Sequence, residues 1–283
     1  MKLAQYSIDG KHCVAAQRGP EVVNLAAVDE DRYGDLANML FTGELGSPEL
    51  ERAVKQAPVF DPLTAFLLPP IGEPQKILCI GLNYADHARE TGQPLPTEPL
   101  VFSKLNTALR GGGHQIALPN VSEQVDYEAE LVVIIGEDGR NIAEHEALEY
   151  VAGYTIGCDV SARDWQKGKP GGQWLLGKSF DGFAPTGPWF VTADDVPDPH
   201  RLDISLRLNG QVMQQSNTRE MIFKIDELIS YISQVCTLTV GDLLFTGTPA
   251  GVGAARDPQV FLRSGDGIEV EIEGLGTLRS RFA

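Results

Sequence analysis

The sequence predicts a β-rich α+β protein, in which a small N-terminal α+β domain is followed by a larger domain built as a mixed β roll. Three features of the 283-residue chain support this fold class. Candidate strands outnumber candidate helices, they do not alternate regularly with helices, and a proline-spaced stretch follows the first part of the chain. Because a doubly wound parallel sheet needs regular strand–helix alternation, that fold is not expected.

The N-terminal domain is predicted to begin with a β-hairpin. Its expected elements are strands at Lys2–Ile8 and Lys11–Ala16 and helices at Asp31–Leu40 and Pro48–Gln56. Asp9-Gly10 separates the two strands and favours a tight hairpin turn. Ser47 can cap the second helix, and Pro48 fits its first turn, where no backbone donor is needed.

A proline-spaced stretch marks the predicted domain boundary. Its prolines are Pro58, Pro62, Pro69, Pro70 and Pro74. Proline lacks the N–H donor that central strands and helix interiors require, so this stretch suits a linker over residues 57–74. We therefore divide the chain into an N-terminal domain, residues 1–70, and a larger domain, residues 71–283.

The larger domain is predicted to consist mostly of strands. The expected strands are Lys76–Ile80, Tyr127–Ile135, Leu202–Leu208, Gln211–Gln215, Leu243–Thr246, Gly267–Ile272 and Gly276–Phe282. Asn209-Gly210 is a strong signal for a type I′ hairpin turn. One helix is expected at Ile225–Gln234, because apolar residues recur there at helical spacing. Its apolar side is formed by Leu228, Ile229, Ile232 and Val235.

Composition and charge exclude two classes of partner. No apolar stretch approaches the roughly 18 residues that span a bilayer, although hydrophobic residues make up 42% of the chain. The 23 basic and 39 acidic residues give a formal charge of −16, which repels nucleic acids and anionic membranes. We therefore expect a small-molecule or protein partner. An anionic substrate would need a locally positive site.

The cysteines indicate a reducing compartment. Cys13, Cys79, Cys158 and Cys236 lie far apart and form no C-x-x-C pair, so a disulfide framework and a zinc-finger spacing are both missing. The N-terminal residues show neither a secretory signal nor a transit-peptide pattern. On these grounds the sequence predicts a cytoplasmic protein.

The segment from Asp126 to Gly136 is the most informative one. Side chains alternate along a strand, so Asp126, Glu128 and Glu130 are expected on one face. Three like charges running into a buried strand repel one another, and a divalent cation would relieve that repulsion. Taken alone, the segment also fits a solvated edge of a half-exposed sheet.

A second acidic position strengthens the metal interpretation. Asp159 ends the apolar run Ile156–Val160 and would complete a site of three carboxylates with Glu128 and Glu130. A lone Asp at a strand end is more often a turn or cap residue. No histidine or cysteine lies beside these acids, so their hard oxygen ligands favour Mg²⁺ or Mn²⁺, with Ca²⁺ possible, over Zn²⁺.

His87 and Glu90 form a candidate catalytic pair. A short helical turn over Ala85–Glu90 would place the two side chains together, because they are three residues apart. A carboxylate beside an imidazole fixes its tautomer and raises its basicity, as a general base requires. On spacing alone, an ordinary surface histidine in a charged helix is the more common explanation.

Two glycine-containing segments are further candidate ligand sites. Gly172–Ser179 fits the nucleotide-binding pattern G-x-x-x-x-G-K-S, but its Gln-Trp-Leu-Leu core is bulky and no helix is expected after Ser179. A nucleotide site is therefore rejected, and Lys178 is kept as a buried cation near the acids. The loop Gly247–Gly253 could bring Thr248 and backbone N–H groups to a ligand, although a purely structural turn fits equally well.

Taken together and in order, these segments resemble the fumarylacetoacetate hydrolase family. The matching strings are Gly81–Tyr84 with His87 and Glu90, Asp126–Leu131, Asp159–Asp164, Lys178–Asp181 and Gly241–Gly253. The resemblance covers about residues 74–283. Within it, the stretch Gly171–Pro188 most resembles the branch called fumarylacetoacetate hydrolase domain-containing protein 2.

The resemblance implies a mixed β-sandwich roll that forms a homodimer. It implies that Mg²⁺ or Mn²⁺ is held by Glu128, Glu130 and Asp159. It also implies a catalytic dyad of His87 and Glu90 on a lid that orders over the substrate. The positions that match substrate-pocket residues of relatives are Arg163, Gln166, Lys178 and Thr248. Asp126 is assigned a supporting role rather than metal ligation.

The expected activity is metal-dependent hydrolysis of a C–C bond in a small anionic dicarbonyl or 2-keto acid, such as an acylpyruvate or a fumarylacetoacetate-like diketo acid. Glu90 would orient His87 to deprotonate water, and Lys178 would offer positive charge to the oxyanion. Isomerisation of 2-hydroxymuconate-type dienoates, and decarboxylation of oxaloacetate, are alternatives within the family. A metal-stabilised binding protein without turnover is the alternative of another class, although the intact dyad argues against it.

Overall fold

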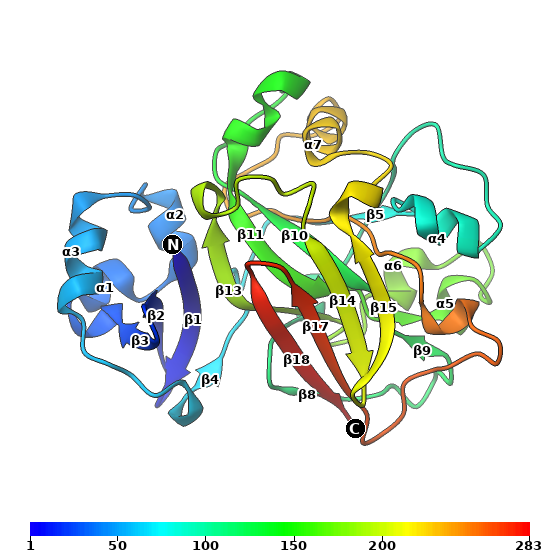
Figure 1. Cartoon of the computed structure of the whole chain (residues 1–283), viewed down its shortest axis with the longest axis horizontal. Helices are drawn as coiled ribbons and strands as arrows, with labels where there is room; N and C mark the ends of the chain where they lie inside the picture. Colours follow the sequence, from blue (N-terminus) through cyan, green and yellow to red (C-terminus); the bar gives the residue numbers. More distant parts are fainter.

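The computed structural model describes all residues from Met1 to Ala283, and strands dominate it (Figure 1). The strands are β1 (Lys2–Ile8), β2 (Lys11–Arg18), β3 (Glu21–Asn24), β4 (Phe66–Leu67), β5 (Ile77–Gly81), β6 (Leu100–Ser103), β7 (Leu109–Gly111), β8 (Gln115–Ile116), β9 (Val125–Asp126), β10 (Ala129–Ile135), β11 (Val151–Cys158), β12 (Ser161–Ala162), β13 (Ala184–Thr192), β14 (Asp203–Leu208), β15 (Gln211–Asn217), β16 (Leu243–Phe245), β17 (Gly267–Ile272) and β18 (Gly276–Phe282). The α-helices are α1 (Glu30–Tyr33), α2 (Leu36–Phe41), α3 (Pro48–Gln56), α4 (Ala85–Glu90), α5 (Arg163–Gln166), α6 (Trp174–Gly177) and α7 (Ile225–Ser233).

The strands form two large mixed sheets and one small pair. The 11-stranded sheet has the order β3-β2-β1-β13-β11-β10-β16-β5-β6, with β4 on β1 and β7 on β13. The five-stranded sheet has the order β15-β14-β17-β18-β8, and β9 pairs with β12. Three pairs are parallel, namely β7 with β13, β5 with β16 and β8 with β18, and the rest are antiparallel. The β-rich α+β roll predicted from the sequence is confirmed.

The two predicted hairpin turns are present. Asp9 and Gly10 join β1 to β2, and Asn209 and Gly210 join β14 to β15. All four residues have positive φ angles, between 50° and 82°, as a type I′ turn requires. These turns fix the registers of both hairpins.

The N-terminal unit extends the large sheet rather than standing apart from it. Strand β1 pairs with β13 through Lys2–Val191 and Leu3–Phe190, and one cluster of 62 buried residues includes side chains from both parts of the chain. Figure 1 shows the unit, in blue, at one end of the molecule. The domain division at residue 70 stays a prediction.

Two helix predictions are corrected. The helix expected over Asp31–Leu40 is broken into α1 and α2, because the Asp35 side chain accepts the N–H of Asn38 and starts a new helix. Val235 was expected on the buried side of the last helix, but it is 76% exposed because α7 ends at Ser233.

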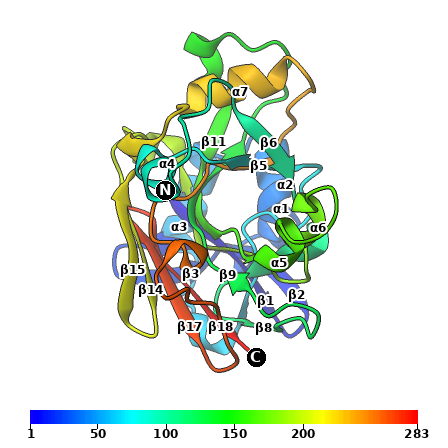
Figure 2. The same cartoon turned by 90° about the vertical axis from the view of Figure 1, so that its right-hand side faces the viewer.

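Strands β10 and β11 run through the centre of the large sheet, and their ends carry the acidic residues predicted to bind metal. All seven residues of β10 are buried. Helices α4, α5 and α6 lie on the side of the molecule away from the N-terminal unit, which Figure 2 views directly. None of the helices is both long and apolar enough to cross a membrane.

Candidate metal and active site

Three carboxylates meet at the ends of the two central strands. Glu128 directly precedes β10, Glu130 is the second residue of that strand, and Asp159 follows β11. Antiparallel pairing places Ala129 opposite Cys158, and the Asp159 N–H donates to the Glu128 carbonyl at 2.9 Å. One ligand atom from each acid lies within 4.8 Å of the others, and all three residues are buried.

Asp126 does not join this group, although strand alternation predicted it on the same face. Tyr127 and Glu128 belong to neither β9 nor β10, so the strand alternation is interrupted between them. The Asp126 carboxylate instead accepts N–H groups of Gly253 at 2.7 Å and Ala254 at 3.0 Å. It therefore lies outside the group of three carboxylates, and its supporting role stays a prediction.

Three buried cations pair with the acids. Arg163 donates to Asp126 at 2.8 Å and to Glu128 at 2.6 Å. Lys178 donates its three hydrogens to Glu128 at 2.9 Å, to Asp159 at 2.6 Å and to the Ser161 hydroxyl at 2.7 Å. Because all three are engaged, Lys178 has no hydrogen left for an oxyanion in this arrangement. Its proposed role there stays a prediction.

The third cation, Lys104, was not singled out in the sequence. It follows β6, and its ammonium group lies 2.5 Å from Asp159 and 3.2 Å from the carbonyl of Val160. The side chain is completely buried. Lys104 thus donates to Oδ1 of Asp159 and Lys178 donates to Oδ2, which fixes the orientation of this carboxylate.

The charges of this cluster do not balance. Four buried acids, Asp126, Glu128, Glu130 and Asp159, face three cations, Lys104, Arg163 and Lys178. Glu130 is the acid without a cationic partner, and it accepts only the Gly247 N–H, at 2.8 Å. Burial, then the charges of Asp159 and Glu128, raise the pKa of Glu130 well above the usual value of a glutamic acid. Burial also opposes ionisation of Glu128, but Arg163 and Lys178 more than offset it and hold the pKa of Glu128 below its usual value.

This arrangement fits a divalent cation. The ligand atoms are carboxylate oxygens, which suit Mg²⁺, Mn²⁺ or Ca²⁺. A cation at this point would supply the positive charge that Glu130 lacks. Glu128, Glu130 and Asp159 are therefore the residues that would hold it.

His87 and Glu90 lie together on α4, as their spacing predicted. The His87 Nδ1 is 3.1 Å from a Glu90 oxygen, and the other Glu90 oxygen accepts the Gly251 N–H at 2.9 Å. Asp86 accepts the His87 N–H at 2.7 Å and the Ser216 hydroxyl at 2.5 Å. These bonds fasten the short helix and leave the Nε2 atom of His87 as the ring nitrogen not paired with Glu90.

A cavity of about 860 Å³ connects the dyad to the carboxylate cluster. The predicted site residues that line it are His87, Glu128, Arg163, Gln166, Lys178 and Thr248. Glu90, Glu130 and Asp159 do not line the cavity, and the last two are almost completely buried. The structure thus brings most of the predicted functional side chains to one cavity, on elements separated widely in sequence.

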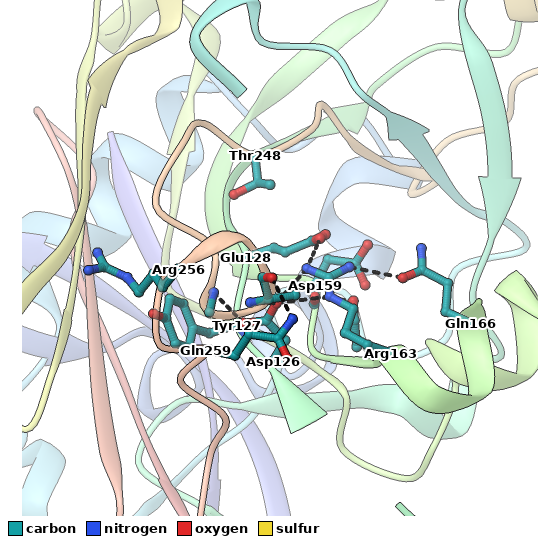
Figure 3. A network of polar contacts seen from close by, with 12 residues as sticks. Asp126, Tyr127, Glu128, Asp159, Arg163, Gln166, Thr248, Arg256 and Gln259 are labelled. Carbon is teal, nitrogen blue, oxygen red and sulfur yellow. Dashed lines mark hydrogen bonds and ion pairs between the residues drawn. The ribbon is translucent and has the colours of Figure 1, made fainter. Parts of the chain in front are cut away.

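The polar side chains of this cavity are held in a network (Figure 3). Arg163 lies between Asp126, Glu128 and Gln166, whose Oε1 accepts an Arg163 hydrogen at 2.9 Å. Thr248 accepts a hydrogen bond from Gln214 at 2.8 Å. The Nε2 group of Gln166 and the hydroxyl hydrogen of Thr248 donate to no protein atom, so both are free to donate to a ligand.

The loop Gly247–Gly253 connects the parts of the site. Its N–H groups were expected to reach a ligand, but those of Gly247, Gly251 and Gly253 donate to Glu130, Glu90 and Asp126. Gly251 has a φ angle of 107°, and a Cβ there would lie 2.1 Å from the Met213 carbonyl. Only glycine fits this position.

Residues Gly172–Ser179, which match the nucleotide-binding pattern, do not form a phosphate-binding loop. Residues Trp174–Gly177 form α6, and Lys178 is committed to the buried acids. Both observations agree with the rejection of a nucleotide site from the sequence.

Comparisons with known proteins place the chain among enzymes. The family described as "Fumarylacetoacetate (FAA) hydrolase C-terminal" matches residues 76–283. The Bos taurus protein "Oxaloacetate tautomerase FAHD2A, mitochondrial" is 46% identical over 283 residues, covering 98% of this chain and 90% of that protein. Its name belongs to the branch that the stretch Gly171–Pro188 resembled, so that resemblance is confirmed.

Two solved structures share the fold over the full chain. A fumarylacetoacetate hydrolase from psychrophilic Exiguobacterium antarcticum is 34% identical, with a TM-score of 0.89 and coverage of 100% of this chain and 99% of the other. The maleylpyruvate hydrolase from Sphingobium sp. SYK-6, solved with manganese (II) ion and pyruvate, is 29% identical, with a TM-score of 0.82 and the same coverage.

The prediction of a cytoplasmic protein is wrong by comparison with the bovine relative. The bovine tautomerase is named as mitochondrial. Unpaired cysteines distinguish reducing from oxidising compartments, so they could not have separated the cytoplasm from another reducing compartment. The sequence match and the two shared folds together establish that this chain is an enzyme of the fumarylacetoacetate hydrolase family.

Proposed function

We propose that this protein is a divalent-metal-dependent enzyme that interconverts the keto and enol forms of a small 2-keto dicarboxylate such as oxaloacetate. The observation that carries the proposal is the position of His87, whose imidazole lines the same cavity as Glu128 and is held through Nδ1 by Glu90. A tautomerase needs one base that can move a proton beside an oxygen-rich metal site. The tautomerase name of the bovine relative supports the choice of substrate.

The cation is proposed to be Mg²⁺ or Mn²⁺, with Ca²⁺ possible, held by Glu128, Glu130 and Asp159. When bound, it would act as a Lewis acid on the keto oxygen of the substrate. The manganese in the maleylpyruvate hydrolase structure supports this class of ion.

The proton would be moved by His87. Glu90 accepts the Nδ1 hydrogen, so Nε2 carries the lone pair that removes a proton from the carbon next to the keto group. His87 then returns that proton to the keto oxygen, which gives the enol, and the reverse sequence restores the ketone. The imidazolium formed in between is stabilised by the Glu90 carboxylate.

Gln166 and Thr248 are proposed to bind the substrate. Their free donors face an acid substrate in the cavity. Arg163 donates from Nε, Nη1 and Nη2 within the protein, but its second Nη1 hydrogen has no protein acceptor. Arg163 would therefore orient Gln166, add positive charge and offer that hydrogen to the substrate. Lys178 is proposed to contribute positive charge to the same end of the cavity.

The test is tautomerisation of oxaloacetate followed by ultraviolet absorbance, with proton NMR to identify products. Protein loaded with Mg²⁺ or Mn²⁺ is expected to speed the interconversion, and chelation should abolish the effect. His87→Asn should lose turnover but keep its metal, whereas His145→Asn, which changes an exposed histidine that does not line the cavity, should match the wild type. Metal-loaded protein that leaves the rate unchanged would contradict the proposal.

A second candidate is C–C hydrolysis of a longer diketo acid. The cavity of about 860 Å³ is near the upper end of typical small-ligand sites and exceeds the needs of a four-carbon acid. His87 could activate water for attack on a carbonyl of an acylpyruvate. Metal-dependent release of pyruvate from an acylpyruvate would support hydrolysis, and release of pyruvate with carbon dioxide from oxaloacetate would indicate decarboxylation instead.

The homodimer implied by the family resemblance is also proposed. Strand β6 lies at an edge of the large sheet and exposes Leu100 and Val101, which a second subunit could cover. Light scattering coupled to size exclusion would measure the mass in solution. A monomeric mass at micromolar concentration would rule the dimer out.

A further inference from the structure

One cation at the cavity has no partner in the protein. Lys167 follows α5 directly, and its ammonium group makes no ion pair and no hydrogen bond. The buried cations nearby, Arg163 and Lys178, are committed to carboxylates. Partial burial, then the positive charge of Arg163, lower the pKa of Lys167 below the usual value of a lysine. An anion bound beside it would remove this penalty.

Lys167 lies where two hollows meet. It lines the main cavity and also a second cavity of about 430 Å³. The two cavities share three lining residues, Arg163, Lys167 and Ala254. The second hollow is mainly polar, with Gln124, Asp164 and Gln259 among its lining residues. A ligand that reaches from the carboxylate cluster toward this hollow passes Lys167.

The charge of the whole molecule makes this position important. At −16 the protein repels dianions, and the main cavity also contains the carboxylates of Glu128 and Glu98. A substrate with a second carboxylate therefore needs a local cation away from the metal-binding acids. Among the lysine and arginine side chains that line the main cavity, Lys167 is the one without an acidic partner.

We propose that Lys167 binds the distal carboxylate of a dicarboxylic 2-keto acid and so selects dicarboxylates over monocarboxylates. The inference rests on the proposed function, because it assumes that the keto-acid end of the ligand binds beside Glu128, Glu130 and Asp159. It goes further by assigning the far end of the ligand to a residue at the junction of the two hollows. The side chain is exposed enough to meet a ligand without a change in the fold.

The test compares two six-carbon ligands that differ only at the far end. Calorimetric titration of Mn²⁺-loaded protein with 2-oxoadipate and with 2-oxohexanoate measures what the second carboxylate contributes, without any turnover. We expect wild-type protein to bind 2-oxoadipate roughly tenfold more tightly or better, which corresponds to about 1.4 kcal/mol. Repeating the comparison with 2-oxoglutarate and 2-oxopentanoate shows the chain length that the site prefers.

Three variants distinguish the effect of Lys167 itself from the effect of the protein's net charge. Lys167→Met should bring the two six-carbon ligands to within about twofold of each other, and Lys167→Arg should keep most of the preference. Lys169→Met is the matched control, because it removes the same charge two residues away. Lys169 stacks on Trp165 and lines neither hollow, so this variant should keep the wild-type preference.

The outcomes distinguish the inference from the function on which it rests. Equal affinity of the wild type for the two ligands, or a preference that survives in Lys167→Met, would overturn the role of Lys167 while leaving the keto-acid site intact. Failure of both ligands to bind the Mn²⁺-loaded wild type would overturn the proposed keto-acid site and the inference with it. Loss of the preference in Lys169→Met as well would mean that net charge, and not Lys167, causes it.

Discussion

The carboxylate cluster and the dyad helix are built in opposite ways, although they line one cavity. Asp159 and Glu130 are 0% and 1% exposed, and ion pairs with buried lysines hold the cluster. The side chains of His87 and Glu90 are 13% and 22% exposed, and α4 is held by hydrogen bonds to one loop and one strand. The proposed metal-binding end of the site is thus fixed inside the core, while the proposed proton-transfer end lies at the solvent boundary.

The difference shows which properties each part can control. The free-energy cost of burying a charge in the core depends strongly on its partners, so the cluster is expected to link metal binding to the stability of the fold. A short helix at the surface contributes little to stability, so the dyad can be altered with effects confined to the reaction. Mutations in the two regions should therefore separate cleanly in their measured consequences.

The largest effect is expected from Asp159→Asn compared with Glu130→Gln. Removing the Asp159 charge leaves Lys104 and Lys178 without their shared partner in the core, and breaking such a buried pair costs about 3–5 kcal/mol. Glu130→Gln removes the acid that has no cation, so the unfolding free energy of chelator-treated protein should stay unchanged or rise. Urea unfolding with a chelator measures both.

The same two variants should fail equally at binding metal. Titration with Mn²⁺ is expected to show loss of the wild-type site in each, since both remove one of the three proposed ligand carboxylates. If Glu130→Gln destabilised the chelated protein as much as Asp159→Asn, the unequal charge compensation described here would be wrong.

The next effect, from altering the dyad, is expected to fall entirely on the activation free energy of the reaction and not on stability. His87→Gln should lower kcat by about 10²–10⁴-fold, the usual contribution of a general base. The midpoint of thermal unfolding and the Mn²⁺ affinity should not change, because His87 forms no hydrogen bond with the buried cluster. Loss of metal affinity in this variant would contradict the separation between the two regions.

The smallest effect should come from the contact that fastens α4. Ser216→Ala removes the hydrogen bond to the Asp86 carboxylate, and a bond to a charged group contributes about 1.5–3 kcal/mol. We expect kcat to fall severalfold while the Mn²⁺ affinity stays at the wild-type value. Ser216→Thr keeps the hydroxyl and should restore most of the rate, and a variant pair with equal rates would mean that this bond does not position His87.

Local pattern was enough to predict nine of the eighteen strands and the spacing of the dyad. Strand β10 and helix α3 were expected from periodicity and capping, and they form within two residues of the expected bounds. The His87–Glu90 pair needed only the i, i+3 geometry of one helical turn. Such features depend on neighbours in the chain, which a sequence displays directly.

The features that were missed depend on residues far apart in the chain. Lys104 lies 55 positions before Asp159, and nothing in its own segment marks it as a buried cation. Strand alternation also placed Asp126 with Glu128 and Glu130, because the interruption at Tyr127 leaves no sign in the residue types. The unpaired state of Lys167 likewise appears only when the surrounding ion pairs are known.

The loop Gly247–Gly253 has a consequence for how this site can change over evolution. It holds Glu130, Glu90 and Asp126 through main-chain N–H groups, which every residue except proline possesses. A substitution cannot delete these donors, provided that the glycines needed for the backbone path are kept. The relative placement of the proposed metal site and base is therefore expected to be inherited robustly, while the side chains that line the cavity are free to change toward new substrates.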